Sequence, residues 1–430
     1  MFSKIKKRDG RIEAFNAEKI AGAVLQAFKE IDGEITAYAQ NKAKEISLYI
    51  ESLGETLIDV EQIQDIVERK LMASNRKDVA KAYILYRDNR SKERERNSRL
   101  TKEIGAKLAA IDVKNQNANV DEKSFGGRMG SANSALMKKF ALDYCLSDMA
   151  KRNHLNNEIY IHDLDHYAVG DHNCLSIPFD KLLANGFNTR QTDVRPAQSV
   201  NTAFQLVAVI FQLQSLQQFG GVSATHLDWT MVPYVRKSFT KHMKDGLRYC
   251  ERKSEYKIER FTKWLNHEFE DGVLHFDNTE FQELHPEAWK YAVDMTERET
   301  RQAVEAMYHN LNTLQSRSGN QLPFTSINYG TCTLPEGRMV TKALLETSIN
   351  GIGKLHKTSI FPCGIFQMMR GVNRAPGDPN YDLYRLALRS TAQRLYPNYA
   401  NVDWSGNAGY DPDDPRTLFS TMGERTLQPI

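Results

Sequence analysis

Residues 5–20 read IKKRDGRIEAFNAEKI, and this stretch decides how the first part of the chain folds. Two short β-like runs flank Asp9-Gly10, a pair of residues typical of a tight hairpin turn. Asn16 stands at a helix N-cap position, because apolar side chains follow it at the helical period and Glu18 falls in the first turn. The stretch therefore predicts a hairpin that leads into a helix.

Three further helices are predicted outward from this stretch. Apolar side chains recur at the helical period over residues 37–53, from Val60 onward, and over residues 79–90. Residues 90–99 then alternate in charge with almost no apolar face, which is typical of a solvated helix or a linker. We therefore expect residues 1–95 to form a separate, mostly helical domain.

Residues 100–430 carry a different pattern, in which long helical stretches alternate with short β-like runs. The helical stretches are residues 131–152, 200–218, 234–269 and 285–315. The β-like runs are residues 158–162, 173–178, 325–329 and 359–364. Residues 126–130, GGRMG, fit no phosphate-binding or dinucleotide fingerprint and are expected to form a flexible turn. This alternation predicts a domain of the α/β class over residues 100–430.

Composition excludes several classes of protein. The 430 residues hold 57 Lys and Arg against 54 Asp and Glu, and this net charge of +3 is too small to indicate nucleic acid as a partner. The 19 Phe, 18 Tyr and 4 Trp exclude a wholly disordered chain, because they supply ample apolar area to bury. No apolar run is long enough for a bilayer, and the charged N-terminus lacks a signal-peptide core. The five cysteines have no paired spacing, which argues against a disulfide framework. Since the sequence also shows no export signal and no membrane-spanning run, we expect a protein of the reducing cytoplasm without membrane partners.

Cations gather at the predicted hairpin turn, where they could bind a polyphosphate. Lys and Arg beside a glycine turn, just ahead of a helix N-terminus, neutralise phosphate charge while backbone N–H groups face the anion. A solvated basic hairpin is the alternative interpretation. The wider pattern favours binding, because residues 7–20, 60–68 and 79–87 resemble, in this order, the ATP cone, a regulatory nucleotide-binding module of ribonucleotide reductases.

The ATP-cone resemblance implies an allosteric site at which ATP promotes activity and dATP suppresses it. The residues at matching positions, which are expected to surround the nucleotide, are Lys7, Arg8, Glu13, Asn16, Lys19 and Arg87. Their chemistry agrees, because cations suit a triphosphate and the polar side chains Glu13 and Asn16 suit a base or sugar. The sequence thus predicts an ATP/dATP site within residues 1–95.

A second polar cluster lies in residues 162–174, which hold three histidines, three aspartates and a cysteine. The spacing of these residues fits no common closed zinc motif, so no metal is expected. Two interpretations remain for Cys174. It is either an inert buried thiol, or a thiol that works in redox chemistry or proton transfer beside His162 or His172.

Six segments resemble the anaerobic, class III, ribonucleoside-triphosphate reductases, and together they extend over essentially the whole chain. These segments are residues 162–165, 173–174, 316–326, 360–362, 401–405 and 411–416. The resemblance implies that residues 100–430 are part of a ten-stranded α/β barrel of the glycyl-radical type. It also implies an oxidoreductase that makes deoxyribonucleoside triphosphates, for DNA replication, by glycyl and thiyl radical chemistry.

Residue roles follow from the same resemblance. Cys174 matches the family's second cysteine, and Asn173 and His162 fall where polar active-site groups are expected. The loop by which a dNTP effector selects the substrate matches Ser316, Arg317, Ser318, Asn320 and Gln321. Gln205 and Gln212 lie on one helical stripe, and they either meet a second subunit or effector or are exposed amides. The implied partners are ribonucleoside triphosphates, a second subunit in a homodimer and a radical-SAM activating enzyme.

One departure from the family concerns the radical chemistry. Residues 421–426 resemble the radical-cysteine loop, but Glu424 stands at the expected cysteine position, and a carboxylate cannot form a thiyl radical. The four-cysteine zinc site and the glycyl-radical motif are also absent from the 430 residues. We therefore expect no turnover by this chain alone, and an unstable second domain unless a C-terminal chain complements it. The alternative function is a nucleotide-binding regulatory module without catalysis.

Overall fold

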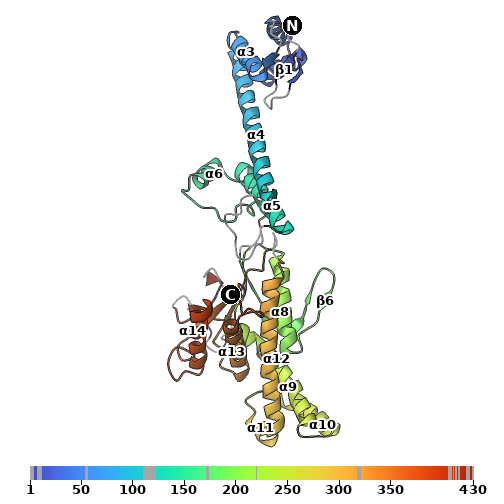
Figure 1. Ribbon diagram of the computed structural model, residues 1–430, viewed down its shortest axis with the longest axis vertical. Coiled ribbons are helices and arrows are strands. Elements are labelled where there is room, and N and C mark those ends of the chain that lie inside the picture. The colour runs from blue at the N-terminus through green and yellow to red at the C-terminus, as the bar shows by residue number, and fades with distance from the viewer. Residues whose placement is uncertain are drawn as a thin grey trace. The chain divides into compact units, whose positions relative to one another are not determined.

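The computed structural model of the chain describes residues 4–6, 12–53, 57–109, 123–170, 174–218, 220–316, 321–404, 409, 411, 414, 417–422 and 427–428. These residues divide into two compact units, Met1–Glu103 and Ile104–Ile430 (Figure 1). The boundary falls within helix α4 (Lys77–Ala109), which includes the charge-alternating residues 90–99. Among the described residues, no helix combines the length and the apolar character needed to cross a membrane.

The first unit is a small three-stranded sheet with helices, of which the sequence predicts the two hairpin strands and the four helices but not the third strand. Strands β1 (Lys4–Lys6) and β2 (Ile12–Ala14) pair antiparallel, and β3 (Leu57–Asp59) pairs parallel to β1. The helices are α1 (Ala17–Asp32), α2 (Ala37–Ser52), α3 (Val60–Met72) and the first part of α4. Asn16 caps α1 as expected, because its side-chain oxygen accepts from the Lys19 N–H at 3.2 Å. Buried side chains such as Phe28 and Ile46 form one core for this unit.

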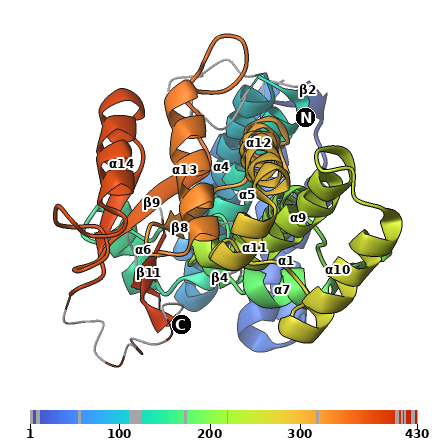
Figure 2. The ribbon, with the colours of Figure 1, turned by 90° about the horizontal axis from the view of Figure 1, so that it is seen from below.

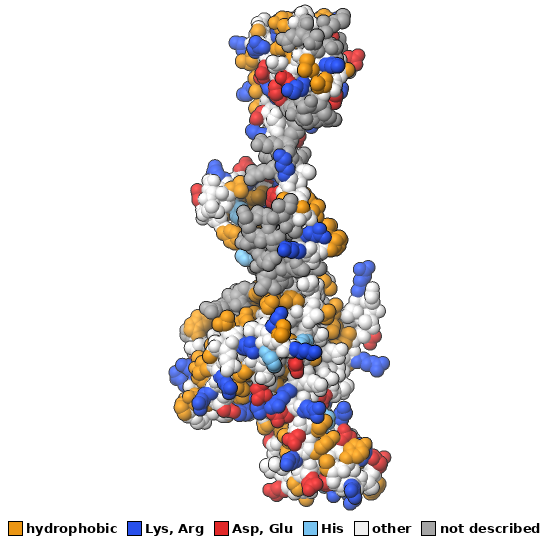
Figure 3. Space-filling model, viewed as in Figure 1, with side chains coloured by type: hydrophobic (Ala, Val, Ile, Leu, Met, Phe, Trp, Pro, Cys, Tyr) orange, Lys and Arg blue, Asp and Glu red, His pale blue; other side chains and the backbone are white. Residues whose placement is uncertain are grey.

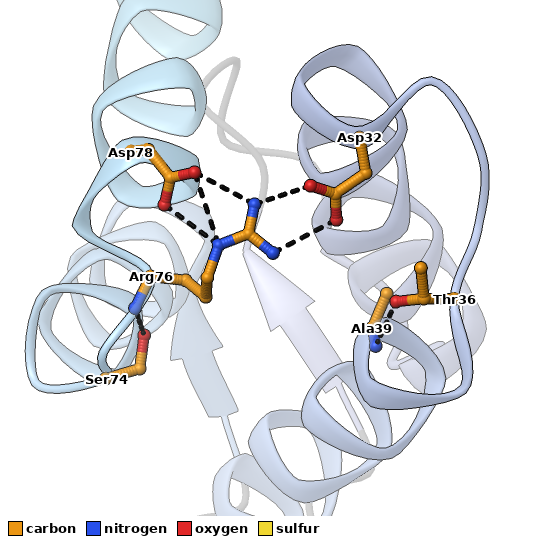
Figure 4. Close-up of polar contacts among 6 residues, drawn as sticks. All are labelled: Asp32, Thr36, Ala39, Ser74, Arg76 and Asp78. Carbon is orange, nitrogen blue, oxygen red and sulfur yellow. Dashed lines mark hydrogen bonds and ion pairs between the residues drawn. The ribbon is translucent and has the colours of Figure 1, made fainter.

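Arg76 ties α1 to the start of α4 within this unit. Its guanidinium donates to Asp32 at the end of α1 (Nη2–Oδ1 2.6 Å) and to Asp78 in the first turn of α4 (Nε–Oδ1 3.0 Å), as Figure 4 shows. It also lies over the Phe28 ring, 5.5 Å from the centroid. The hydrogen bonds that Arg76 donates to both carboxylates raise the pKa of Arg76, and they lower the pKa of Asp78.

The second unit has a five-stranded, wholly parallel sheet in the order β10-β9-β8-β7-β4. Its strands are β4 (Leu175–Ile177), β7 (Val222–Ala224), β8 (Thr325–Tyr329), β9 (Cys363–Met368) and β10 (Asn398–Asn401). The helices that pack with it are α7 (Phe179–Asn185), α8 (Val200–Ser215), α9 (Leu227–Tyr249), α12 (Pro286–Thr313), α13 (Pro335–Asn350) and α14 (Tyr381–Arg394) (Figure 2). The predicted α/β class is thus confirmed, with half of the ten strands that the family resemblance implies.

Two smaller features extend from this α/β core. Helices α10 (Glu255–Glu268) and α11 (Thr279–Leu284) pack with α9 and α12 around a satellite core that includes Phe239 and Trp289. Strands β5 (Phe187–Asn188) and β6 (Asp193–Val194) form a short hairpin.

On the face drawn in Figure 3, basic and acidic side chains are mixed over the surface, in keeping with the small net charge.

Several sequence predictions for this unit were wrong in detail. Residues 126–130 form the first turns of helix α5 (Phe125–Phe140) instead of a flexible turn, because Ser124 caps the helix through the Gly127 N–H. The helix predicted over 131–152 is interrupted by the π-helix η1 (Ala141–Cys145), and Ser147 caps a new helix, α6 (Asp148–Leu155). The helix predicted over 234–269 breaks at residues 250–254, where Arg252 adopts φ 51°. Residues 158–162 form turns and no strand, and the strand predicted over 359–364 begins at Cys363.

Asp143 joins α5, η1 and α6. Its carboxylate accepts hydrogen bonds from Lys139 and Lys151, each at 2.7 Å. Burial by itself raises the pKa of Asp143, but the two lysine hydrogen bonds outweigh it and hold the pKa below its usual value. The contribution of Asp143 to stability is therefore present above the ordinary aspartate pKa and is lost as the pH falls through the depressed value.

Replacing Arg76 with Ala should lower the free energy of unfolding of the first unit by about 1–2 kcal/mol. Charge-assisted hydrogen bonds contribute about 1.5–3 kcal/mol when shielded and less at partly exposed positions such as this one. Hydrogen exchange of the α1 and α4 amides in the full chain measures the loss. Arg69→Ala, at an exposed position on α3, is the matched control and should leave the exchange rates unchanged. Equal effects of the two substitutions would show that the Arg76 contacts do not stabilise the attachment of α1 to α4.

Replacing Asp143 with Asn should accelerate hydrogen exchange in α6 at pH 7, because two lysines lose their charged acceptor. The difference between variant and wild type should disappear as the pH falls through the depressed pKa of the wild-type carboxyl, because that carboxyl is then itself protonated. Exchange measured on both proteins over a series of acidic pH values is the check. A difference that persists unchanged at every pH would contradict the ion-pair interpretation.

Candidate functional site

A cavity of about 150 Å³ opens in the first unit between the hairpin, α1, α3 and α4. Its lining includes three residues that the sequence predicts for the nucleotide site: Glu13, Asn16 and Lys19. Apolar and aromatic side chains complete it from the neighbouring elements, among them Phe15, Val60 and Tyr83. The structure therefore brings these three predicted residues together on one cavity wall.

The cavity combines two kinds of surface that a nucleotide needs. Tyr83 and Phe15 are aromatic residues of the lining, Gln64, Glu13 and Asn16 are polar ones, and Lys19 carries a positive charge. Asn16 uses its side-chain oxygen to cap α1, so its position follows from the helix start. Lys7 and Arg8 lie outside the described residues.

Arg87 has a different environment from the other predicted residues. Its guanidinium donates to three carboxylates, Glu61 (2.6 Å), Asp65 (2.7 Å) and Glu68 (2.8 Å), all on α3. Burial on its own lowers the pKa of Arg87, but hydrogen bonds to these acids outweigh it and raise the pKa above its usual value. Arg87 is thus held between α3 and α4, one turn along α4 from Tyr83, and does not line the cavity in the described structure.

The two faces of the parallel sheet in the second unit differ in polarity. Val222, Ile327 and Phe366 lie on the face that packs against the helices. On the other face, polar residues are aligned in register across three strands, Ser176, Ser223 and Ser326, while β9 adds the buried Cys363 and Ile365 to the same face. Cys174 is half-buried and directly precedes β4. Parallel sheets usually bury apolar side chains on both faces, and a polar face therefore indicates a site.

Asn328 and Gln367 bind a returning segment of chain on this polar face. The fully buried Asn328 amide donates to the Thr421 carbonyl (2.9 Å) and accepts from the Thr421 N–H (3.3 Å), as a neighbouring strand would. It also donates to the Ala224 carbonyl at 3.0 Å. Gln367 donates to the Phe419 carbonyl at 3.2 Å. These two side chains thereby position β11 (Ser420–Thr421), which lies immediately before residues 423–426.

Buried polar groups also fix the loop that follows β8. The Asp228 carboxylate accepts from the Gly330 and Cys332 N–H groups at 2.8 and 3.0 Å, and Asn373 and Asn380 donate to the carbonyls of the same loop. Gly330 adopts φ +119°, where an added Cβ would meet the Phe366 ring at 3.0 Å, so glycine is required there. Complete burial raises the pKa of Asp228 in spite of these hydrogen bonds.

The remaining predicted residues are placed as follows. His162 lies in an exposed turn, with its side chain 69% exposed and paired to Asp163 (Nδ1–Oδ2 2.8 Å), so the predicted strand end is replaced by a turn. Ser316 and Gln321, two residues of the predicted effector loop, are half-buried. Gln205 is exposed, and Gln212 is half-buried with an amide nitrogen that has no partner among the described residues. Asn173, Arg317, Ser318, Asn320 and Glu424 lie outside the described residues.

Sequence reasoning missed the carboxamides of the polar face. Asn328 and Gln367 each lie between two apolar residues in short strands, Ile327 and Tyr329 in one and Phe366 and Met368 in the other, and this interruption was the available signal. It also missed Gln64 and Tyr83 in the cavity, where Tyr83 was expected only to be a core residue. Among the described residues, no group of three or more His, Cys, Asp and Glu side chains is placed to hold a metal ion.

Replacing Asn328 with Ala should release residues 419–421 and lower stability by about 2–4 kcal/mol, because it leaves buried backbone groups without partners. Hydrogen exchange at the Thr421 N–H and proteolysis within residues 417–422 measure the release. Thr325→Val on the same strand is the control. The buried Thr325 hydroxyl has no partner among the described residues, so its removal should be neutral or slightly stabilising. Unchanged protection of Thr421 in the Asn328 variant would contradict the proposed anchor.

Comparisons with known proteins match each of the two units to a family model. The family model described as "ATP cone domain" matches residues 3–92, and the one described as "Anaerobic ribonucleoside-triphosphate reductase" matches residues 116–428. The chain is 31% identical over 400 residues to the anaerobic ribonucleoside-triphosphate reductase of Haemophilus influenzae, covering 92% of this chain and 52% of that one. It is 30% identical over 402 residues to the Escherichia coli enzyme of that name, covering 93% of this chain and 51% of that one. The chain thus spans about half the length of the curated relatives that it matches.

Two further similarities cover smaller shares of the chain. The ribonucleoside-diphosphate reductase subunit alpha of Chlamydia pneumoniae is 41% identical over 96 residues, covering 20% of this chain and 9% of that one. A solved structure of the Thermotoga maritima anaerobic ribonucleotide reductase in complex with dATP and CTP aligns with a TM-score of 0.43 at 12% identity, covering 66% of this chain and 44% of that one. The family model that matches residues 116–428 extends over more than half of the chain. This polypeptide therefore belongs to the anaerobic ribonucleoside-triphosphate reductase family and carries an ATP cone ahead of its reductase part.

Proposed function

We propose that this chain is the nucleotide-sensing part, together with one section of the catalytic domain, of a reductase that converts ribonucleoside triphosphates to deoxyribonucleoside triphosphates. The observation that carries the proposal is the cavity of the first unit, which gathers Glu13, Asn16 and Lys19 beside Tyr83. We assign ATP and dATP to this cavity as allosteric effectors. In this assignment Lys19 contacts phosphate, and the polar side chains contact the sugar or base, while Lys7 and Arg8 add charge from the hairpin.

In the second unit we assign substrate chemistry to the polar face of the sheet. Cys174 is the proposed reactive thiol of this chain, with Asn173 next to it and His162 as a further polar group. We assign the dNTP specificity effector to the loop that contains Ser316, Arg317, Ser318, Asn320 and Gln321. Apolar side chains of the helices cover the opposite face of the sheet, and we therefore assign the chemistry to the polar face.

We assign the radical part of the reaction to polypeptide outside these 430 residues. Glu424 stands at the position matching the radical cysteine, and its carboxylate cannot supply a thiyl radical. In this proposal the radical cysteine, the glycyl radical and the zinc site that the family implies are supplied from outside these residues. Homodimerisation, activation by a radical-SAM enzyme and a cytoplasmic location are further parts of this proposal that the family implies.

Calorimetry with ATP and dATP on the 430-residue chain tests the effector site. Lys19→Ala should weaken binding about tenfold or more, since a charge-assisted contact is worth about 1.5–3 kcal/mol, and Lys7→Ala and Arg8→Ala should do the same. Lys29→Ala, an exposed lysine ten residues further along α1, is the matched control and should bind as the wild type does. Unchanged affinity in all three test variants would refute the site.

A further inference from the structure

A single guanidinium on α4 joins three carboxylates of α3. Glu61, Asp65 and Glu68 stand at positions i, i+4 and i+7 of α3, so they share one side of that helix, where like charges repel. The Nη2 atom of Arg87 donates to Glu61 at 2.6 Å, and its Nη1 atom donates to Asp65 and Glu68 at 2.7 and 2.8 Å. Arg87 thus offsets a row of negative charge and fixes α4 to α3 at the same time.

These contacts lie beside the cavity of the first unit. Tyr83 lines the cavity and precedes Arg87 by four residues, which places both side chains on one side of α4. On α3, Gln64 lines the cavity and directly precedes Asp65. The bridge between the two helices therefore stands about one helical turn from the cavity wall that both helices supply.

The width of the cavity depends on how α3 and α4 are held together. Ile63 of α3 and Tyr83 of α4 are 3% and 5% exposed, and both belong to the apolar core of the unit as well as to the cavity lining. Because packed cores have little free space, a shift of one helix against the other moves these shared side chains. Whatever fixes α4 against α3 thereby also fixes the shape of the cavity.

We infer that Arg87 is a positioning residue for the effector cavity, an inference that rests on the proposed function. It holds α4 against α3 and so sets the spacing of the cavity walls, and it makes no contact with the phosphates itself. The family pattern places Arg87 among the nucleotide ligands, but the guanidinium does not line the cavity and already has three carboxylate partners. Helix α4 continues to Ala109, so the element that Arg87 holds is also the one that crosses the boundary between the units.

Direct contact with phosphate is the rival role, and the arrangement of charge opposes it. To reach a phosphate, Arg87 would have to leave its carboxylate partners, which would lose the cation that offsets their mutual repulsion. The two roles predict opposite effects when these carboxylates are removed. A phosphate ligand would be released and would bind ATP more tightly, whereas a positioning residue would lose its anchor and bind ATP more weakly.

Calorimetry with ATP on the 430-residue chain tests the inference. Arg87→Met should weaken ATP binding about fivefold or more, the size expected when two contacting elements are uncoupled. Arg90→Met is the matched control, because Arg90 is an exposed arginine three residues further along α4 that pairs with Glu93 on the same helix. It should bind ATP as the wild type does.

Variants of the α3 acids separate positioning from direct contact. The triple variant Glu61→Ala, Asp65→Ala and Glu68→Ala should weaken ATP binding as Arg87→Met does, although it removes negative charge from the neighbourhood of a triphosphate. The exchanged pair Arg87→Glu with Glu68→Arg should restore most of the affinity that either substitution alone removes, because the bridge between the helices is rebuilt with its charges reversed. A phosphate ligand at position 87 would not be replaced by this exchange.

Either of two results would overturn the inference: Arg87→Met leaves the ATP affinity unchanged, or the triple acid variant binds ATP more tightly than the wild type. A wild-type chain that binds no ATP would contradict the proposed function instead. Hydrogen exchange without nucleotide distinguishes that case, because Arg87→Met should still accelerate exchange of the α3 and α4 amides and leave those of α9 and α12 unchanged. If exchange in α3 and α4 also stayed unchanged, Arg87 would not hold the two helices together.

Discussion

The second unit depends on a constraint that burial imposes on amides: a polar group removed from water must find a hydrogen-bond partner inside the protein. The parallel sheet places serine and carboxamide side chains on a buried face, and each needs such a partner. Asn328 meets the requirement with the neighbouring strand β7 and a returning segment of chain, and Asp228 meets it with the loop after β8. The positions of the loops at the carboxyl ends of the strands follow from these bonds.

The first unit uses a different balance of forces. Its core is apolar, and its helices meet through buried aliphatic and aromatic side chains. Charged contacts lie around this core, with Arg76 between α1 and α4 and Arg87 between α3 and α4. These arginines fix the helices from the outside, and neither of them lines the cavity.

Much of the first unit could be predicted from the sequence, because its signals are local. The Asn16 cap, the hairpin strands and the periodic helices each depend on residues within a few positions of one another. The cavity residues Glu13, Asn16 and Lys19 came from the family pattern. The role of Tyr83 in the cavity was missed, because an aromatic residue on an apolar helix face has the same pattern whether it is buried or lines a cavity.

The second unit was harder to predict for a physical reason. Strands β7 and β10 have only a few residues each, and what defines them is pairing with strands far away in the chain. Helix breaks at residues 141–147 and 250–254 lie within continuous helical periodicity, so that the pattern alone could not locate them. The role of Asn328 and Gln367 depends on the return of β11 and its neighbours to the sheet. Their partners lie about ninety residues further along the chain for Asn328 and about fifty for Gln367.

The sheet order β10-β9-β8-β7-β4 has a consequence for how the chain would self-associate at high concentration. All five strands run the same way, and the two edges are therefore different surfaces. A contact that continued the sheet with the same strand direction would join β10 of one molecule to β4 of the next. Such head-to-tail contacts produce rings or open-ended filaments and no two-fold symmetric pair.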